Sequence, residues 1–192
     1  MAGRFLDKLL VRGKHVCPSW LCFTFDNPLR RIFHDPDKII APYISPGVTV
    51  LDIGPGQGYF TIPMCRLVGG EGRVIAVDIQ EKMLKAVQRR AAAAGMAGRL
   101  TTHLSRADDF DLTEPADFIL AFWMVHEVPE PRLFLARVKG LMKPAALFLI
   151  AEPLFHVTKG RFEHTLTIAQ ELGFKIAARP QISFSYAAAL VL

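Results

Sequence analysis

The stretch from Val48 to Phe60 constrains the fold of this chain more than any other. It begins with an apolar, β-branched run, which is typical of a buried strand, and continues into a turn that contains Gly54, Gly56 and Gly58. Glycine lacks a Cβ atom, so the backbone of such a turn can come close to a ligand. We therefore predict a strand, a glycine-rich turn and a helix that together hold a small molecule.

Strand-like and helix-like segments alternate after this stretch, which predicts an α/β fold with a doubly wound sheet and right-handed crossovers. The expected strands are residues 48–53, 73–78, 100–105, 116–122, 145–152, 174–178 and 184–192. One expected helix begins near Phe60, and three others cover residues 80–94, 131–141 and 159–172. Pro63 fits only in the first turn of its helix, because proline has no amide hydrogen to donate.

The chain has 192 residues, which is enough for one domain with a sizeable core. We expect a single domain over residues 1–192, with an N-terminal cap at 1–45 and a Rossmann-like core at 46–192. Charged residues interrupt every apolar run, and residues 1–10 lack the continuous apolar segment of a secretory signal. These features predict a cytoplasmic protein that does not span a membrane.

The cap mixes aromatic, proline and basic residues without a long periodic pattern, and includes the aromatic cluster Trp20, Phe23, Phe25 and Phe33. It either packs on the core or closes over a substrate. His15, Cys17 and Cys22 also lie there, and their side chains would suit a metal or metalloid. Buried thiols are the alternative interpretation, and we predict no metal site.

Two acidic residues flank the glycine turn: Asp52 precedes Gly54 by two residues, and Asp78 ends the next strand. Ligands of open parallel sheets bind at the carboxyl ends of the strands, where Asp78 can accept both hydroxyls of an adenosine ribose. The glycine spacing is G-x-G-x-G, whereas a dinucleotide site has G-x-G-x-x-G. An acidic group at Asp52 repels a pyrophosphate and suits a ligand with ammonium and sulfonium groups. This pattern favours S-adenosylmethionine over a nicotinamide cofactor.

Residues 50–58 and 74–79 resemble the first two motifs of the class I S-adenosylmethionine-dependent methyltransferases, and further similarity extends from about Ile39 to Gly173. The similarity is greatest to small stand-alone members that act on low-molecular-weight substrates. It implies a seven-stranded sheet in the order 3-2-1-4-5-7-6 with the last-formed strand antiparallel. The implied activity is methyl transfer to a small-molecule acceptor, by a monomer or a homodimer.

The resemblance also implies a set of cofactor-binding residues: Asp52, Gly54, Pro55, Gly56, Asp78, Ile79, Met83, Ala107, Asp108, Ala121 and Phe122. Asp52 would orient the methionine amino group, and Asp78 would bind the ribose hydroxyls. The backbone at Gly54 and Gly56 would lie against the methionine and the ribose.

The adenine ring would contact the remaining residues of this set. Ile79 and Met83 would pack on its faces, although Met83 fits the core equally well. Asp108 would accept a hydrogen bond from the exocyclic amine, with Asp109 as the alternative one residue later.

His126 and Glu127 follow the fourth expected strand and are the catalytic candidates. Methyl transfer from a sulfonium is an in-line displacement that needs an aligned nucleophile and, for some acceptors, a base. His126 either takes the acceptor proton or fixes the loop, and Glu152 at the end of the fifth strand points into the same crevice. No Asn-Pro-Pro-Tyr or Asp-Pro-Pro-Tyr follows the fourth strand, which counts against methylation of an exocyclic base amine.

Two other functions fit the sequence. The net charge of +5, with Arg30, Arg31 and Lys38 near the crevice, leaves an RNA methyltransferase open. A module that binds the cofactor without transferring a methyl group is the second alternative. Because the chain has no long basic run, a small-molecule acceptor is the expected partner rather than nucleic acid.

Overall fold

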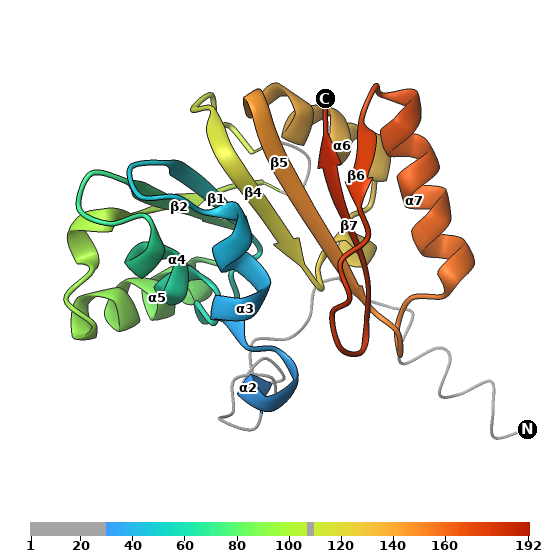
Figure 1. Cartoon of the computed structure of the whole chain (residues 1–192). Coiled ribbons are helices and arrows are strands. Elements are labelled where there is room, and N and C mark those ends of the chain that lie inside the picture. The colour runs from blue at the N-terminus through green and yellow to red at the C-terminus, as the bar shows by residue number, and fades with distance from the viewer. Residues whose placement is uncertain (1–29, 107–109) are drawn as a thin grey trace, which may run out of the picture.

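The computed structural model describes residues 30–106 and 110–192, and these form a seven-stranded sheet covered by helices (Figure 1). The strand order is β3-β2-β1-β4-β5-β7-β6. The strands are β1 (Thr49–Ile53), β2 (Arg73–Asp78), β3 (Leu100–Leu104), β4 (Ala116–Phe122), β5 (Met142–Pro153), β6 (Lys175–Ala178) and β7 (Ser185–Val191). Among these strands β7 is antiparallel to both β5 and β6, and the other neighbouring pairs are parallel. The predicted fold class, strand order and antiparallel last strand are confirmed.

Helices cover both faces of this sheet. The α-helices are α2 (Arg30–Phe33), α3 (Pro36–Ile40), α4 (Thr61–Leu67), α5 (Glu81–Ala93), α6 (Pro131–Gly140) and α7 (Lys159–Glu171). Short 3-10 turns are η2 (Ala41–Tyr43), η3 (Ala97–Arg99) and η4 (Val125–Glu127). In Figure 1, α2 lies below the sheet, on the side of the arrowhead of β4.

The core is divided into two layers by the side-chain alternation of the strands. All five residues of β1 are buried. Leu51 belongs to the layer that α6 and α7 cover, whereas Val50 packs in the layer that contains Met64 and Cys65 of α4. Burial on both faces explains why Val50, Leu51 and Ile53 of β1 are all apolar although they do not alternate with exposed polar residues.

The predicted helix after the glycine turn begins at Thr61, one residue later than expected. Pro63 is its third residue, in the first turn, where the helix does not need its missing amide hydrogen. Cys65 is fully buried in this helix, and burial raises the pKa of its thiol to about 11. Cys65 therefore packs as a small apolar side chain rather than as a reactive thiolate.

The start of β5 differs from the expected strand. The strand begins at Met142, three residues earlier than predicted, and its register against β4 shifts between Ala116 and Phe118. Ala145 has a φ of 65°, which is the left-handed region. Pro144 is tolerated in this irregular segment because a bulge leaves some backbone groups outside the ladder.

The cap can be followed only from residue 30. Ile40 of α3 is fully buried in the core, which fits a segment packed on the sheet. His15, Cys17, Cys22 and the aromatic cluster before Phe33 lie outside the described residues. The division at residue 45 and the single-domain organisation remain predictions. Within residues 30–106 and 110–192, no helix is long and apolar enough to cross a membrane.

Candidate cofactor and acceptor site

The glycine turn after β1 has the open backbone that the sequence predicts. Gly54, Gly56 and Gly58 have φ angles of 69°, 55° and 88°, a region that glycine adopts without steric cost. The amide of Gly54 donates to the carbonyl of Val77 in β2, 2.9 Å away. A Cβ atom on Gly54 would lie 3.0 Å from Cγ of Met124, whereas one on Gly56 would meet nothing within 4 Å. The turn is packed at its start and open at Gly56, where a ligand could lie against the backbone.

Asp52 is buried at the carboxyl end of β1 and faces α4. Its Oδ2 atom accepts a hydrogen bond from the Thr61 hydroxyl, 2.6 Å away. The pKa of Asp52 is raised from its ordinary value of 3.8 to about 7, chiefly by burial. The hydrogen bond from the Thr61 hydroxyl lowers this pKa in part, and the nearby charge of Asp78 adds to the rise. A cation placed here would restore the ionised carboxylate.

Asp78 ends β2, the strand next to β1. Its Oδ1 atom accepts a hydrogen bond from the backbone amide of Gln80, 2.8 Å away. Burial raises the pKa of Asp78 to about 6, backbone amides lower it, and the charge of Glu127 raises it. Asp52, Asp78 and Glu127 therefore form an acidic edge at the carboxyl ends of neighbouring strands, which disfavours a pyrophosphate and favours a cationic ligand.

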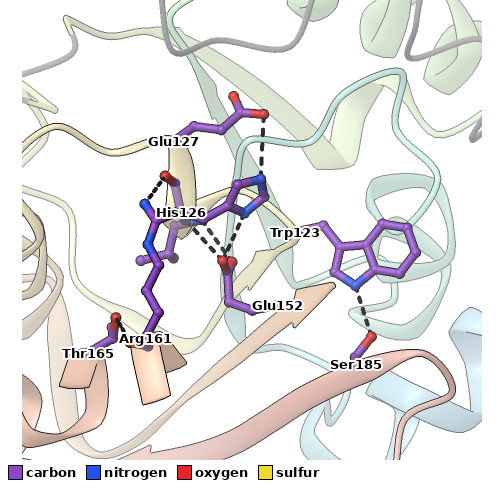
Figure 2. Close-up of polar contacts among 8 residues, drawn as sticks. Trp123, His126, Glu127, Glu152, Arg161, Thr165 and Ser185 are labelled. Atoms are coloured by element: carbon purple, nitrogen blue, oxygen red, sulfur yellow. Dashed lines mark hydrogen bonds and ion pairs between the residues drawn. The ribbon is translucent and has the colours of Figure 1, made fainter. Parts of the chain in front are cut away.

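Glu152, at the end of β5, holds the segment that carries the catalytic candidates (Figure 2). Its carboxylate accepts hydrogen bonds from the backbone amides of Val125 and His126, both at 3.0 Å. Oε2 of Glu152 also lies 2.8 Å from Nδ1 of His126. Because a carboxylate only accepts, Nδ1 carries the hydrogen in this contact and Nε2 is left without one in the neutral ring.

The other side of the His126 ring faces Glu127. Nε2 of His126 lies 4.0 Å from Oε1 of Glu127, and Figure 2 shows the ring between the two glutamates. The guanidinium of Arg161 in α7 donates to the carbonyl of His126 at 2.8 Å. His126 is therefore held from α7 and from β5, and both interpretations of its role, base and loop support, fit these contacts.

Trp123 closes the site next to β4. It has a φ of 59°, an uncommon conformation for a bulky residue. Its backbone amide donates to the carbonyl of Ala151 at 2.7 Å, and its indole Nε1 donates to Oγ of Ser185 at 2.8 Å. These two bonds fix the indole between β4 and the start of β7 and explain how the strained backbone persists.

Exposed apolar side chains form a rim beside Trp123, and its members are Phe33, Leu154, Phe155 and Phe184. The ring of Phe155 packs edge-on against Trp123 with centroids 5.2 Å apart, and Phe33 packs against Phe184 at 5.3 Å. The amide of Leu154 donates to the carbonyl of Phe184 at 3.0 Å, which joins the two halves of the rim. Adjoining exposed aromatic side chains of this kind are typical of a ligand entrance.

The structure brings most of the predicted cofactor-binding residues to one edge of the sheet, and these are Asp52, Gly54, Pro55, Gly56, Asp78, Ala121 and Phe122. Ile79 follows β2 and is 39% exposed, so its side chain is available to a ligand. Met83 is buried in α5, and its contact with the adenine remains a prediction beside its interpretation as a core residue. Ala107, Asp108 and Asp109 lie outside the described residues.

Two residues that hold the site have roles the sequence alone did not assign. The Thr61 hydroxyl donates a hydrogen bond to Asp52. The sequence feature that could have indicated this role is a threonine in the first turn of the helix after the glycine turn. Glu152 was expected in the crevice, but its bonds to the amides of η4 were not. No group of three or more His, Cys, Asp and Glu side chains in the described ranges could hold a metal ion.

The strand order, the open glycine turn and the acidic ends of β1 and β2 define the fold of the class I S-adenosylmethionine-dependent methyltransferases. Residues 44–177 match the family described as a methyltransferase domain, and the chain belongs to that family. The crystal structure of an S-adenosylmethionine-dependent methyltransferase from Aquifex aeolicus has a TM-score of 0.81 to this chain at 25% identity. That similarity covers 92% of this chain and 100% of the Aquifex chain.

Curated relatives match part of this chain. The ubiquinone/menaquinone biosynthesis C-methyltransferase UbiE of Marinomonas sp. (strain MWYL1) is 32% identical over 107 residues, which cover 55% of this chain and 43% of that protein. The ubiquinone biosynthesis O-methyltransferase of Caulobacter vibrioides is 30% identical over 134 residues, with 70% and 51% covered. The chain thus spans about half the length of these relatives.

Proposed function

We propose that this chain binds S-adenosylmethionine at the carboxyl ends of β1, β2 and β4 and transfers its methyl group to a small-molecule acceptor. The observation that carries this proposal is the pair of carboxylates at the ends of β1 and β2, buried Asp52 and partly buried Asp78, beside the open turn at Gly56. The pKa of each carboxyl is raised chiefly by burial, to which the charge of Asp78 adds at Asp52 and the charge of Glu127 adds at Asp78. A ligand with an ammonium and a sulfonium group would offset the negative charges of these carboxylates, whereas a pyrophosphate would be repelled by them.

Each part of the cofactor has an expected partner in this arrangement. Asp52 orients the methionine amino group, and the backbone from Gly54 to Gly56 lies against the methionine and the ribose. Asp78 accepts from the ribose hydroxyls, and the exposed side chain of Ile79 packs on the adenine. Ala107 and Asp108 are the expected partners of the adenine nitrogens. Ala121 and Phe122 line the methionine side.

The apolar rim supports a small, partly apolar acceptor. Its aromatic side chains offer flat apolar surface beside the end of β4, where the methyl group is expected. The names of the UbiE relative and the Caulobacter relative associate them with ubiquinone or menaquinone biosynthesis, which fits an aromatic or quinol-like acceptor. A nucleic acid would be expected to meet basic rather than apolar side chains at the entrance.

In the proposed reaction, the acceptor atom forms a bond to the methyl carbon as the carbon–sulfur bond breaks. Sulfur keeps the electron pair and becomes the uncharged thioether sulfur of S-adenosylhomocysteine. Where the acceptor carries a proton, Nε2 of His126 takes it, and Glu152 holds the ring with Nδ1 protonated. Glu127, beside Asp78, adds to the negative potential around the sulfonium.

Methyl transfer from labelled S-adenosylmethionine tests this proposal, with a panel of phenols, catechols and quinols and with total RNA as the competing acceptor. We expect label in at least one small molecule and none in RNA. His126→Ala should lower the rate by about a hundredfold or more if the histidine is the base, while His164→Ala, an exposed histidine on α7, should leave it unchanged. Cofactor binding without any transfer would support the binding-module alternative.

A further inference from the structure

Two bulky residues beside the apolar rim have a left-handed backbone conformation. Trp123 has a φ of 59°, and Phe184, one residue before β7, has a φ of 54°. This conformation brings the Cβ atom too close to the backbone, so it costs free energy for residues other than glycine. A bulky side chain kept at such a position indicates that the side chain itself is needed, for the fold or for a function.

The indole of Trp123 has a role in the fold. Its Nε1 atom donates to Oγ of Ser185 at 2.8 Å, and Figure 2 shows the indole directed at that hydroxyl. The ring also packs edge-on against the buried ring of His34, with centroids 4.9 Å apart. These contacts tie the end of β4 to the start of β7 and to the cap, so packing accounts for the tryptophan.

The ring of Phe184 contributes much less to the fold. Phe184 is 51% exposed, and Phe33, whose ring packs against it, is itself 50% exposed. The backbone carbonyl of Phe184 accepts a hydrogen bond from the amide of Leu154 at 3.0 Å, a contact that glycine would form equally well. The fold therefore needs the turn at this position but gives little reason for an aromatic ring in it.

The turn after β5 connects Phe184 with the catalytic candidate His126. Leu154 of this turn donates its amide to the Phe184 carbonyl. The next two residues carry rings: Phe155 packs edge-on against His156 with centroids 5.1 Å apart, and the His156 ring stacks on the His126 ring at 6.0 Å, with 11° between the planes. A continuous series of side chains therefore leads from the proposed proton acceptor to the rim.

A ligand that reacts at His126 and extends to the rim has two ends of different character. Its reacting end lies beside Glu127 and Glu152, where a hydroxyl or another group that carries a proton fits. Its other end meets the rings of Phe155 and Phe184, which are both more than half exposed. An apolar group that covers these two rings removes their surface from water, which is favourable.

We propose that Phe155 and Phe184 form an apolar subsite that binds an apolar substituent of the methyl acceptor, so that the enzyme selects acceptors that carry one. The inference rests on the proposed function and deepens it. Phe184 determines specificity in this account without touching the reacting atoms. The backbone cost at Phe184 is the consequence of a ring that is kept for the ligand.

The binding of 4-hexylphenol and of phenol tests the proposal, because the two probes differ only in the hexyl chain. Both are titrated calorimetrically into the chain saturated with S-adenosylhomocysteine. We expect one 4-hexylphenol per chain, bound at least about tenfold more tightly than phenol. Phe184→Gly should reduce this ratio to about threefold or less, and Phe184→Leu, which keeps an apolar side chain, should lie between the two.

Thermal unfolding separates this role from a structural one. Glycine removes the backbone cost and loses a half-exposed ring, so the melting temperature of Phe184→Gly should stay within about 3 °C of the wild type. Ala145→Gly is the matched control, because Ala145 has a φ of 65° near the start of β5, whereas the subsite follows its end. Leu192→Ala removes an exposed apolar side chain beyond the other end of β7. Neither control should change the ratio of the two affinities.

Three results would overturn the subsite. They are an unchanged ratio in Phe184→Gly, an equal loss in Leu192→Ala, and a melting temperature of Phe184→Gly more than about 8 °C below the wild type, which would make the ring structural. 4-Hexylphenol should also compete with the methylated acceptor in the labelled transfer assay, and inhibition of any other kind would contradict the acceptor role.

The proposed function fails in a different measurement. A wild-type chain that binds S-adenosylhomocysteine but prefers 4-hexylphenol over phenol by less than about threefold would overturn the subsite alone. A wild-type chain that binds no S-adenosylhomocysteine would overturn the proposed function and the subsite with it.

Discussion

The carboxylate of Glu152 accepts three hydrogen bonds from one segment of η4, and its contact with Nδ1 of His126 is the shortest of them at 2.8 Å. Glu152 is 3% exposed, so water does not compete for these bonds. One buried side chain at the end of β5 thus sets the backbone of η4 and the orientation of the His126 ring, and the removal of an acceptor oxygen should affect both.

Glu152→Gln tests this role. The amide group of glutamine has one acceptor oxygen, so either the Val125 amide or the His126 donors face an NH₂ group. We expect a loss of about 1–3 kcal/mol in the free energy of unfolding, measured by urea denaturation. Glu163→Gln is the control, because Glu163 and Arg179 form an exposed ion pair whose loss should cost less than about 1 kcal/mol. Equal costs in the two variants would contradict the role of Glu152.

The raised pKa of Asp52 predicts a stability that falls with pH. The folded carboxyl, with a pKa of about 7, holds its proton over a range where the unfolded carboxyl, at 3.8, has lost it. The free energy of unfolding therefore decreases between about pH 4 and pH 7, by up to roughly 1.4 kcal/mol per pH unit for one group. Asp78, with a pKa of about 6, also lowers the free energy of unfolding as the pH rises toward 6.

Asp52→Asn should flatten this dependence between pH 6 and pH 7, where Asp78 is at least half ionised and contributes less. Thr61→Val should move the upper limit of the window to higher pH, because the Thr61 hydroxyl lowers the pKa of Asp52. Urea denaturation at pH 5, 6, 7 and 8 measures both effects. A wild-type profile that is no steeper than that of Asp52→Asn would contradict the burial argument.

The same two carboxyls predict that cofactor binding releases protons. A cationic ligand favours the ionised forms of Asp52 and Asp78, so binding near pH 6 should release about one proton, and binding at pH 8.5 almost none. Calorimetric titration with S-adenosylmethionine in two buffers of different ionisation enthalpy measures the number of protons released per ligand bound. Asp52→Asn should reduce the release at pH 6, and proton uptake in the wild-type chain would refute the charge assignment.

Gly54 and Gly56 offer a matched pair of substitutions in one turn. Both have positive φ, so alanine at either position carries a backbone cost of about 1–2 kcal/mol. Gly54→Ala also places a Cβ atom 3.0 Å from Met124, while Gly56→Ala points into open space. We expect Gly54→Ala to be the less stable variant, and Gly56→Ala to keep its fold but weaken the binding of S-adenosylhomocysteine. The reverse order of stability would contradict the packing at Met124.

Most of the fold could be predicted because its signals are local. The apolar run at 48–53, the alternation of strands and helices and the proline in the first turn of α4 each reflect a preference of neighbouring residues. These signals placed most strand ends within one residue. The start of β5 was missed because its bulge depends on the register against β4.

The candidate site could be predicted only in part. Asp52 and Asp78 stand at the ends of strands, so parallel topology alone brings them to one edge. The contacts of Glu152 join residues 26 positions apart, and the contact between the rings of Phe33 and Phe184 depends on how the cap packs on the sheet. The pKa values of the two aspartates follow from burial, which the sequence pattern does not quantify.

Calorimetric titration of the wild-type chain and of Asp78→Asn with S-adenosylhomocysteine tests the central claim most directly. We predict one ligand per chain with a Kd of about 1–100 µM, which corresponds to roughly 5–8 kcal/mol, and an affinity at least about tenfold lower in Asp78→Asn. Asp37→Asn, on α3, which bears no cofactor contact in this account, should bind like the wild type, because Asp37 pairs with Arg31. Equal binding by wild type and Asp78→Asn, or a preference of the wild-type chain for NAD, would contradict the account.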